Sequence, residues 1–359
     1  MKIGFLVGNI NISGGVERVV TTLANYFSVD LRYEIVIYSQ YQTESGELPY
    51  DLNSNVEIKY LNYAPKGIEG SYKTCLNELF FLYKKLKDEK LNYLITTKTF
   101  HNVYFAILSP LLKYSVIGSH HEEYQSDTEK WNMLKKIFYR SLHGVAVLTH
   151  NDYTFYEKLN KNVKIIPNAI PFVRSYNYKA ENKKILMVGR LSSEKSMEYG
   201  IYAWKKLNHE YPDWILEIVG EGPEKLKLKE LVKELNLEGK VILSGFTSNV
   251  EGKYKEAAFS LLTSQKEGFG CVLIESLAKG IPVISFNNVG PMSIIEHGKN
   301  GFLVNKNDLT ELIKSMECII QDCQLRYTLS VGAYKSSENY MIQSIADKWK
   351  SLLDNREGI

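Results

Sequence analysis

Charged residues and glycines gather on two short loops in the second half of the chain, each directly after an apolar run. The first loop holds Gly189, Arg190 and Lys195 and follows the run Lys184–Val188. Glycine frees the turn, and two cations beside the start of the next helix can bind a diphosphate. An ordinary strand–helix loop with solvated charges explains these residues equally well when they are taken alone.

The second loop opens a helix that carries Glu275 further along. The loop residues are Glu267, Gly268, Phe269, Gly270 and Cys271. The glycines let the backbone approach a ligand, and the amides of the first helical turn can donate to a phosphate or a sugar hydroxyl. Glu275 has apolar neighbours, and a carboxylate in such surroundings is unusual unless it binds a ligand. It could accept hydrogen bonds from the paired hydroxyls of a ribose or a hexose. We favour this interpretation over one in which Glu267 caps the helix and Glu275 is a surface charge.

Three further loops follow apolar runs and say less when taken alone. Gly14 and Gly15 start a helix after the first run, but they do not form the Gly-x-Gly-x-x-Gly dinucleotide fingerprint, and a tight turn is their simpler interpretation. His120 and His121 stand at the end of another run, where neighbours point to opposite faces, so at most one of them should line a ligand site. The loop Val289–Ser293 enters a helix at the same edge of its sheet.

Short apolar runs alternate with segments of helical period along the chain, which predicts parallel α/β sheets covered by helices on both faces. The expected strands are Lys2–Val7, Glu34–Ser39, Val56–Leu61, Tyr93–Thr97, Ser115–Ser119, Val145–Leu148, Val163–Ile166, Lys184–Val188, Trp214–Val219, Val241–Leu243, Phe259–Leu262 and Val283–Ser285. The expected helices include Val16–Phe27, Tyr72–Asp88, Glu129–Ser141, Met197–Glu210, Pro223–Leu235 and Cys271–Ala278, and the end of the chain from about Leu309 to Leu353 is helical.

The chain of 359 residues is long enough for two doubly wound domains. We expect one domain over residues 1–168, a linker over 169–182, a second domain over 183–335 and a C-terminal helix over 336–359. Ligands of such sheets bind outside the carboxyl ends of the strands. If the two domains face each other, the binding site lies in the cleft between them.

Composition and charge narrow the class further. A hydrophobic share of 44% and a charged share of 24% are typical of a soluble globular protein, and a net charge of +3 gives no overall field for nucleic acid. The start, MKIGFLVGNI, lacks the longer apolar region of a signal peptide, and no run is long enough to cross a bilayer. Cys75, Cys271, Cys318 and Cys323 form no Cys-x-x-Cys pair, so we expect a cytoplasmic protein with reduced thiols and no metal site.

Together these motifs resemble the nucleotide-binding domain of the retaining GT-B glycosyltransferases of family 4, the "glycosyl transferases group 1". The matching stretches are VGRLSSEKSMEYGI, LEIVGEGPEKLKLKELVKEL, VILSGF and LLTSQKEGFGCVLIESLAKGIPVISFNNVGPMSIIEHGKNGFLV, with looser matches in SGGVERVVTTLANYFS and VIGSHHEEY. The resemblance implies two Rossmann-like domains facing across a cleft, the first for the acceptor and the second for the nucleotide sugar. It also implies that the C-terminal helix packs back on the first domain.

The resemblance assigns roles to residues. Arg190 and Lys195 would bind the donor diphosphate and stabilise the leaving group without a metal ion. Glu267 would contact the transferred sugar, and Glu275 would hold the ribose hydroxyls. The other donor contacts that it implies are Gly15, Gly189, Phe246, Gly268, Phe269, Gly270 and Cys271. One histidine would bond the sugar near the anomeric centre, and because many relatives carry an acidic residue followed by His here, we favour His121 over His120.

The same resemblance implies a retaining transfer in which the acceptor hydroxyl attacks on the side of the leaving group and a donor phosphate oxygen takes its proton. A UDP-sugar is the expected donor, with GDP-mannose still open. The acceptor would be a glycan or a lipid-linked glycan in polysaccharide or glycoconjugate synthesis. The segments Phe80–Lys87 and Lys130–Arg140 are basic and aromatic, and they either rest on the cytoplasmic face of a membrane or form ordinary helices with a solvated basic face.

Three rival functions stay in view. A non-catalytic glycosyltransferase-like subunit, which binds glycan or chaperones a partner enzyme, would be favoured by loss of Arg190, Lys195 or Glu275, and all three are present. A nucleotide-sugar epimerase would need further acid–base carboxylates around the sugar. An NAD-dependent oxidoreductase would need the glycine fingerprint and its acidic residue, which are missing.

Overall fold

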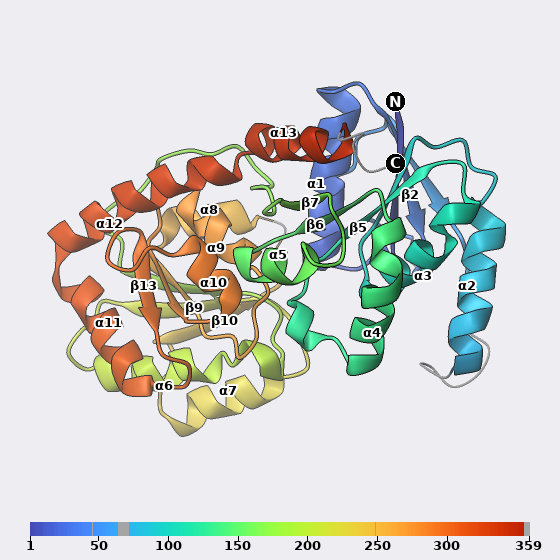
Figure 1. The fold of residues 1–359 in the computed structure, drawn as a ribbon. Coiled ribbons are helices and arrows are strands. Elements are labelled where there is room, and N and C mark those ends of the chain that lie inside the picture. Colours follow the sequence, from blue (N-terminus) through green and yellow to red (C-terminus); the bar gives the residue numbers. More distant parts are fainter. Residues whose placement is uncertain (45, 64–71, 248, 355–359) are drawn as a thin grey trace. The chain divides into compact units, whose positions relative to one another are not determined.

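A computed structural model describes residues 1–44, 46–63, 72–247 and 249–354, and the chain divides into two compact units (Figure 1). Unit 1 comprises Met1–Pro171 together with Ile342–Ile359, and unit 2 comprises Phe172–Met341. Each unit is built on one sheet of parallel strands with helices packed against it. The prediction of two doubly wound, Rossmann-like domains is therefore confirmed. No helix in the described ranges is long and apolar enough to cross a membrane.

The sheet of unit 1 has the strand order β3-β2-β1-β4-β5-β6-β7. Its strands are β1 (Lys2–Val7), β2 (Glu34–Ser39), β3 (Val56–Tyr60), β4 (Tyr93–Thr96), β5 (Ser115–Ser119), β6 (Gly144–Val147) and β7 (Val163–Ile165). Its helices are α1 (Gly15–Val29), α2 (Tyr72–Leu86), α3 (Thr99–Leu108), α4 (Glu129–Phe138), α5 (His150–Tyr156) and α13 (Ile342–Leu353). The central strand β1 is buried from Ile3 to Val7, as expected for a parallel strand covered on both faces.

The C-terminal helix α13 packs on α1, β6 and β7 within unit 1. Leu352 lies against Gly144, where an added Cβ would stand only 2.7 Å from the leucine Cδ1 atom. The end of the helix is held through its carbonyls, because the Tyr93 hydroxyl donates to Leu353 O at 2.7 Å and Asn162 Nδ2 donates to Leu352 O at 3.1 Å. The helix is thus an integral part of unit 1, although the chain reaches it only after completing unit 2.

The sheet of unit 2 has the strand order β10-β9-β8-β11-β12-β13. Its strands are β8 (Lys184–Val188), β9 (Ile215–Val219), β10 (Val241–Gly245), β11 (Phe259–Leu262), β12 (Val283–Phe286) and β13 (Gly301–Val304). Its helices are α6 (Glu198–Leu207), α7 (Lys225–Glu234), α8 (Val250–Glu256), α9 (Cys271–Leu277), α10 (Val289–Ile294), α11 (Leu309–Gln321) and α12 (Cys323–Ser336).

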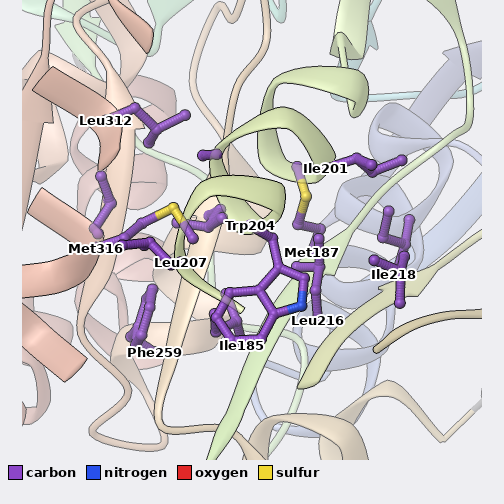
Figure 2. Close-up of a cluster of buried hydrophobic side chains, with 14 of the residues drawn as sticks. Ile185, Met187, Ile201, Trp204, Leu207, Leu216, Ile218, Phe259, Leu312 and Met316 are labelled. Atoms are coloured by element: carbon purple, nitrogen blue, oxygen red, sulfur yellow. The ribbon is translucent and has the colours of Figure 1, made fainter. Parts of the chain in front are cut away.

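One face of the unit 2 sheet carries a large apolar core (Figure 2). Trp204 of α6 is buried between the sheet residues Ile185 and Phe259 and the neighbouring helix α11, which contributes Leu312 and Met316. The indole nitrogen of Trp204 is satisfied by Lys240 O at 3.0 Å, so the ring is buried without an unpaired donor. This core fixes the strands whose carboxyl ends carry the polar loops described next.

The first residues of unit 2 are fastened to its helices. The buried Lys279 Nζ donates to Val173 O and to Ser175 Oγ, both at 2.8 Å, and Arg174 stacks on the Tyr334 ring with its guanidinium carbon 3.8 Å from the ring centre. From Phe172 onward, the segment expected to be a linker over 169–182 therefore has the contacts of a packed part of unit 2.

Candidate functional site

The strand order of unit 2 reverses at β8, because β9 lies on one side of it and β11 on the other. The loops that follow β8 and β11 therefore leave adjacent strands, at the switch point where ligands of such sheets bind. Lys195 from the first loop and Glu267 from the second meet there, with 2.6 Å between Lys195 Nζ and Glu267 Oε2. The side chains are 23% and 13% exposed, so the pair is sheltered and still open to a ligand.

Ser264 and the backbone hold this pair in place. Ser264 Oγ donates to Glu267 Oε2 at 3.2 Å, and Gln265 N donates to Glu194 O at 2.7 Å, which ties the two loops together. Thr263 Oγ1 donates to Ser196 O at 2.8 Å. The contacts run along both loops, so the geometry of the ion pair is set by the fold of unit 2 alone.

Arg190 and Lys195 lie on the loop that leads from β8 into α6, close to where the sequence places the start of that helix, at Met197. A single 3₁₀ turn over Ser193–Lys195 comes first, and Ser196 then adopts a left-handed conformation with φ of 45°. The α-helix begins only at Glu198, because this left-handed residue breaks the helical run. Arg190 is exposed at the start of the loop.

The loop Glu267–Cys271 packs closely on the first turn of α10, the helix that follows β12. Gly290 N donates to Glu267 O at 3.1 Å, and a Cβ added at Gly290 would stand 2.5 Å from the Phe269 backbone. Gly270 has a φ of 95° and precedes the first residue of α9. The Phe269 ring is buried, so this residue can offer a ligand only its backbone.

Glu275 is fully buried in α9, and its Oε2 atom accepts a hydrogen bond from the Tyr254 hydroxyl at 3.2 Å. The alternative in which Glu275 is a surface charge is therefore wrong. Glu267 does not cap the helix either, since Gly270 occupies that position and the Glu267 carboxylate binds Lys195.

Two other strand ends complete this edge of the unit 2 sheet. Phe246, directly after β10, leaves 57% of its surface exposed, which is unusual for so large an apolar ring. Gly220, after β9, has a φ of 149°, and a Cβ there would stand 1.9 Å from Gly189 O, so the backbones of the two loops touch. The close approach at Gly220 was not assigned from the sequence, although the glycine-rich stretch GEG after a strand is the signal that marks it.

The two adjacent histidines of unit 1 have different surroundings. His120 is buried between two tyrosines, with Nε2 at 3.0 Å from the Tyr139 hydroxyl and Nδ1 at 3.1 Å from the Tyr156 hydroxyl. Lys135 Nζ donates to that same Tyr156 hydroxyl at 2.7 Å. Burial, with Lys135 nearby, holds the pKa of His120 well below its usual range, so His120 is a neutral member of a buried network.

His121 lines a small cavity together with Ser119, Asn168 and Trp349. Its Nε2 atom lies 3.2 Å from Ser119 Oγ, and burial lowers the pKa of His121 to about 4. Of the two histidines, His121 is therefore the one that lines a cavity. It is also the one that the family resemblance favoured as the sugar contact.

The switch point of unit 1 lies between β1 and β4. A Cβ added at Gly15, where α1 begins, would meet no atom within 4 Å, so the backbone there is open. Lys98, two residues past the end of β4, extends its ammonium over Gly8, where a Cβ would stand 2.2 Å from Lys98 Nζ. Burial raises the pKa of the nearby Glu17 carboxyl, and the charge of Lys98 opposes that rise. Sequence reasoning missed Lys98, and its place just after a strand was the available signal.

Among the described residues, no three His, Cys, Asp or Glu side chains are grouped as metal ligands. The polar groups at the carboxyl ends of the strands are instead ammonium, carboxylate, imidazole and backbone amides. Such groups bind phosphates and sugar hydroxyls through hydrogen bonds and charge.

Two Rossmann-like units with polar loops at their strand ends define the architecture of the GT-B glycosyltransferases. The model of the family "Glycosyl transferases group 1" matches residues 171–336. A glycosyltransferase of Haemophilus influenzae, itself uncharacterised, is 30% identical over 359 residues, which cover 98% of this chain and 99% of that protein. This chain belongs to the group 1 glycosyltransferase family.

Two further similarities carry more specific descriptions. A Campylobacter jejuni enzyme, described as GalNAc-alpha-(1->4)-GalNAc-alpha-(1->3)-diNAcBac-PP-undecaprenol alpha-1,4-N-acetyl-D-galactosaminyltransferase, is 27% identical over 364 residues and is covered, like this chain, to 98%. A crystal structure of a Staphylococcus aureus TarM mutant in complex with fondaparinux, alpha-GlcNAc-glycerol and UDP superimposes with a TM-score of 0.80 at 15% identity, over 99% of this chain and 100% of that one. The second similarity is one of fold.

Proposed function

We propose that this protein is a retaining, metal-independent glycosyltransferase of family 4 that moves a hexose or an N-acetylhexosamine from a UDP-sugar to a glycan or lipid-linked glycan. The observation that carries the proposal is the Lys195–Glu267 pair at the switch point of unit 2. Transfer from a nucleotide sugar needs a cation for the departing diphosphate and an acceptor group for the sugar hydroxyls. Here the two groups stand 2.6 Å apart, on loops locked to each other.

The ion pair gives the donor site a simple order of events. A diphosphate carries more charge than one carboxylate and competes for the Lys195 ammonium, with Arg190 as a second cation on the same loop. Glu267 then loses its partner and can accept hydrogen bonds from the sugar. As the sugar–phosphate bond breaks, negative charge grows on the diphosphate, and cations already in position stabilise that charge more than they stabilise the bound donor.

The remaining donor contacts follow from the family resemblance. Glu275 would hold the ribose hydroxyls, Phe246 would border the nucleoside, and Gly189 and Gly268 with the amides up to Cys271 would lie near the phosphates and sugar. In unit 1, Gly15 and His121 would contact the diphosphate and the transferred sugar. A neutral His121, as its lowered pKa implies, can either donate or accept a hydrogen bond without adding charge near the anomeric carbon.

The reaction that we propose retains the anomeric configuration. The acceptor hydroxyl attacks from the side of the leaving diphosphate, the bond from the anomeric carbon to the phosphate oxygen breaks, and a phosphate oxygen takes the hydroxyl proton. The protein then supplies binding, orientation and electrostatic stabilisation, and no residue is alkylated.

The proposed class of acceptor rests on the relatives. The Campylobacter jejuni relative is described as acting on an undecaprenol-diphosphate-linked glycan. On unit 1, α4 exposes Met133 and Ile137 beside the basic Lys130, Lys136 and Arg140, and α2 exposes Phe80. We propose that these apolar and basic side chains of a cytoplasmic protein contact an anionic membrane surface, where a lipid-linked acceptor would be held.

Calorimetric titration of the purified chain with UDP, GDP and uridine, with and without EDTA, tests the donor assignment. UDP should bind with the same affinity in both buffers, and uridine, which lacks the diphosphate, should bind much more weakly. A panel of UDP-hexoses and UDP-N-acetylhexosamines then identifies the sugar. Absence of binding by all of these nucleotides would contradict the proposal, and binding of GDP alone would replace the nucleotide.

A further inference from the structure

We infer that Trp349 of the C-terminal helix α13 is a positioning residue for His121, and that α13 thereby fixes this half-buried imidazole and limits the water that reaches its buried Nδ1 side. The inference rests on the proposed function, in which His121 contacts the transferred sugar. It concerns a helix that the chain adds to unit 1 only after unit 2 is complete.

A cavity of about 10 Å³ lies within unit 1 between His121 and α13. Trp349 and Ile345 line it from α13, Leu23 lines it from α1, and most of its other walls are apolar. A space of this volume admits one water molecule at most. The indole of Trp349 and the imidazole of His121 therefore border the same small space.

The hydrogen bonds of His121 do not fix its ring by themselves. Nε2 has one contact, to Ser119 Oγ at 3.2 Å, while Nδ1 is buried and meets no hydrogen-bonding partner in the described part of the chain. A ring with one hydrogen bond can still turn and tilt about it. Packing must then decide where the imidazole points, and Trp349, 3% exposed, is the largest side chain that lines the cavity.

The same packing decides the charge of His121. Burial lowers its pKa to about 4, and the cavity wall contains no other titratable side chain. The adjacent His120 is neutral. The charged groups on the surrounding elements are Glu122 on its own loop, Glu17 and Arg18 on α1, and Asp347, Lys348 and Lys350 on α13. Letting water into the cavity would reduce the desolvation and move the pKa back toward about 6.5.

Replacing Trp349 with Leu opens the cavity without adding a charge, so it separates positioning from electrostatics. The test follows the His121 Cε1–H signal by NMR against pH in the full chain, with His121→Gln used to assign the signal. In the native protein this signal should stay constant between about pH 5.5 and 8. In Trp349→Leu the pKa should rise by about one unit or more, and in Trp349→Phe, which keeps an aromatic wall, it should stay near the native value.

Leu352→Ala is the matched control, because Leu352 is on the same helix but packs on Gly144 instead of lining the cavity. It should lower the free energy of unfolding, while in the folded protein α13 stays in place and the pKa of His121 is unchanged. If Trp349→Leu does not fold, Ile345→Val enlarges the same cavity by one methylene and should raise the pKa by a smaller amount. A native pKa of His121 in a folded Trp349→Leu or Ile345→Val variant overturns the inference.

Kinetics supply the second readout. With a UDP-sugar that the native enzyme turns over, Trp349→Leu should lower kcat by about tenfold or more and leave the KM for the donor within about twofold, because the donor diphosphate binds to unit 2. Trp349→Phe should restore most of kcat. If no nucleotide binds to the native chain, the proposed function fails, whereas the NMR comparison still decides whether Trp349 positions His121.

Discussion

Replacing Lys195 with Met removes the cation that contacts the Glu267 carboxylate at the switch point of unit 2. Lys195 Nζ lies 2.6 Å from Glu267 Oε2, and the two side chains are 23% and 13% exposed. The substitution keeps an unbranched side chain that is one heavy atom shorter, and it deletes the charge. We expect it to weaken UDP binding strongly and to change the stability of the fold only slightly.

The magnitude follows from the two roles of the ammonium. A hydrogen bond to a charged group contributes about 1.5–3 kcal/mol, which corresponds to a loss of about 10- to 150-fold in affinity for UDP. Glu267, left without its partner, repels the diphosphate and acts in the same direction. The native ion pair is partly exposed and screened, so its loss should lower the free energy of unfolding by no more than about 1 kcal/mol.

Isothermal titration with UDP and with uridine separates these effects. UDP should bind Lys195→Met about 10- to 150-fold more weakly than it binds the native protein, while the weak binding of uridine should not change, because uridine carries no phosphate. Lys206→Met is the matched control, since Lys206 is an exposed lysine on α6. Equal UDP affinity of Lys195→Met and native protein would refute the assignment of the diphosphate to this loop.

Four further perturbations test other parts of the site. Glu275→Gln removes the charge of a buried carboxylate that accepts a hydrogen bond from Tyr254. Titration should show that the affinities for UDP and for uridine both fall by about 10-fold or more. Unchanged affinities would show that Glu275 is not part of the nucleoside site. Phe246→Ala should weaken both ligands by about 1 kcal/mol with no change in thermal stability, and an unaffected Kd would leave the exposed ring without a ligand role. Gly290→Ala places a Cβ 2.5 Å from the Phe269 backbone, so it should lower both the melting temperature and the donor affinity. Native values of both quantities would show that the two segments can move apart without cost. Burial holds the pKa of His101 and His120 well below about 6.5, so the unfolded chain binds more protons than the folded chain as the pH falls. Urea unfolding should therefore show that the free energy of unfolding decreases from about pH 7 to pH 5. A constant free energy of unfolding over this range would contradict the burial of the two histidines as neutral rings.

The doubly wound architecture could be predicted from the sequence because the strands are short apolar runs with helical segments between them. Central parallel strands are buried on both faces, so β1 needs no alternation and is recognisable as a continuous run. The burial of Glu275 was likewise foreseeable, since its apolar neighbours occupy every face of α9.

Other elements gave no such signal. The helix α3 was missed because it buries His101 and Asn102 along with its apolar residues, so no polar stripe marks its period. The strand β13 begins at Gly301, which is a glycine because a Cβ would stand 2.1 Å from Val283 O, and glycine at that position hides the strand pattern. Packing against partners distant in sequence determines both elements.

The site itself divides in the same way. The sequence identified Lys195 and Glu267 as separate motifs, but only the order of β8 and β11 brings them into contact. The surroundings of His120 and His121 depend on tyrosines and on α13, which lie far along the chain. Lys98 was missed because its significance comes from Gly8, directly after the neighbouring strand β1, over which its ammonium lies.

The central claim is transfer of a sugar from a UDP-sugar with retention, through a donor site built on Lys195 and Glu267. Its most direct test is proton NMR of the native chain incubated with the UDP-α-sugar that it binds, with water as the acceptor. The proposal predicts UDP and the α-anomer of the free sugar as the first products, with both lost in Lys195→Met. Initial release of the β-anomer would contradict retention, and no turnover of any bound UDP-sugar, with or without a glycan acceptor, would contradict the catalytic function.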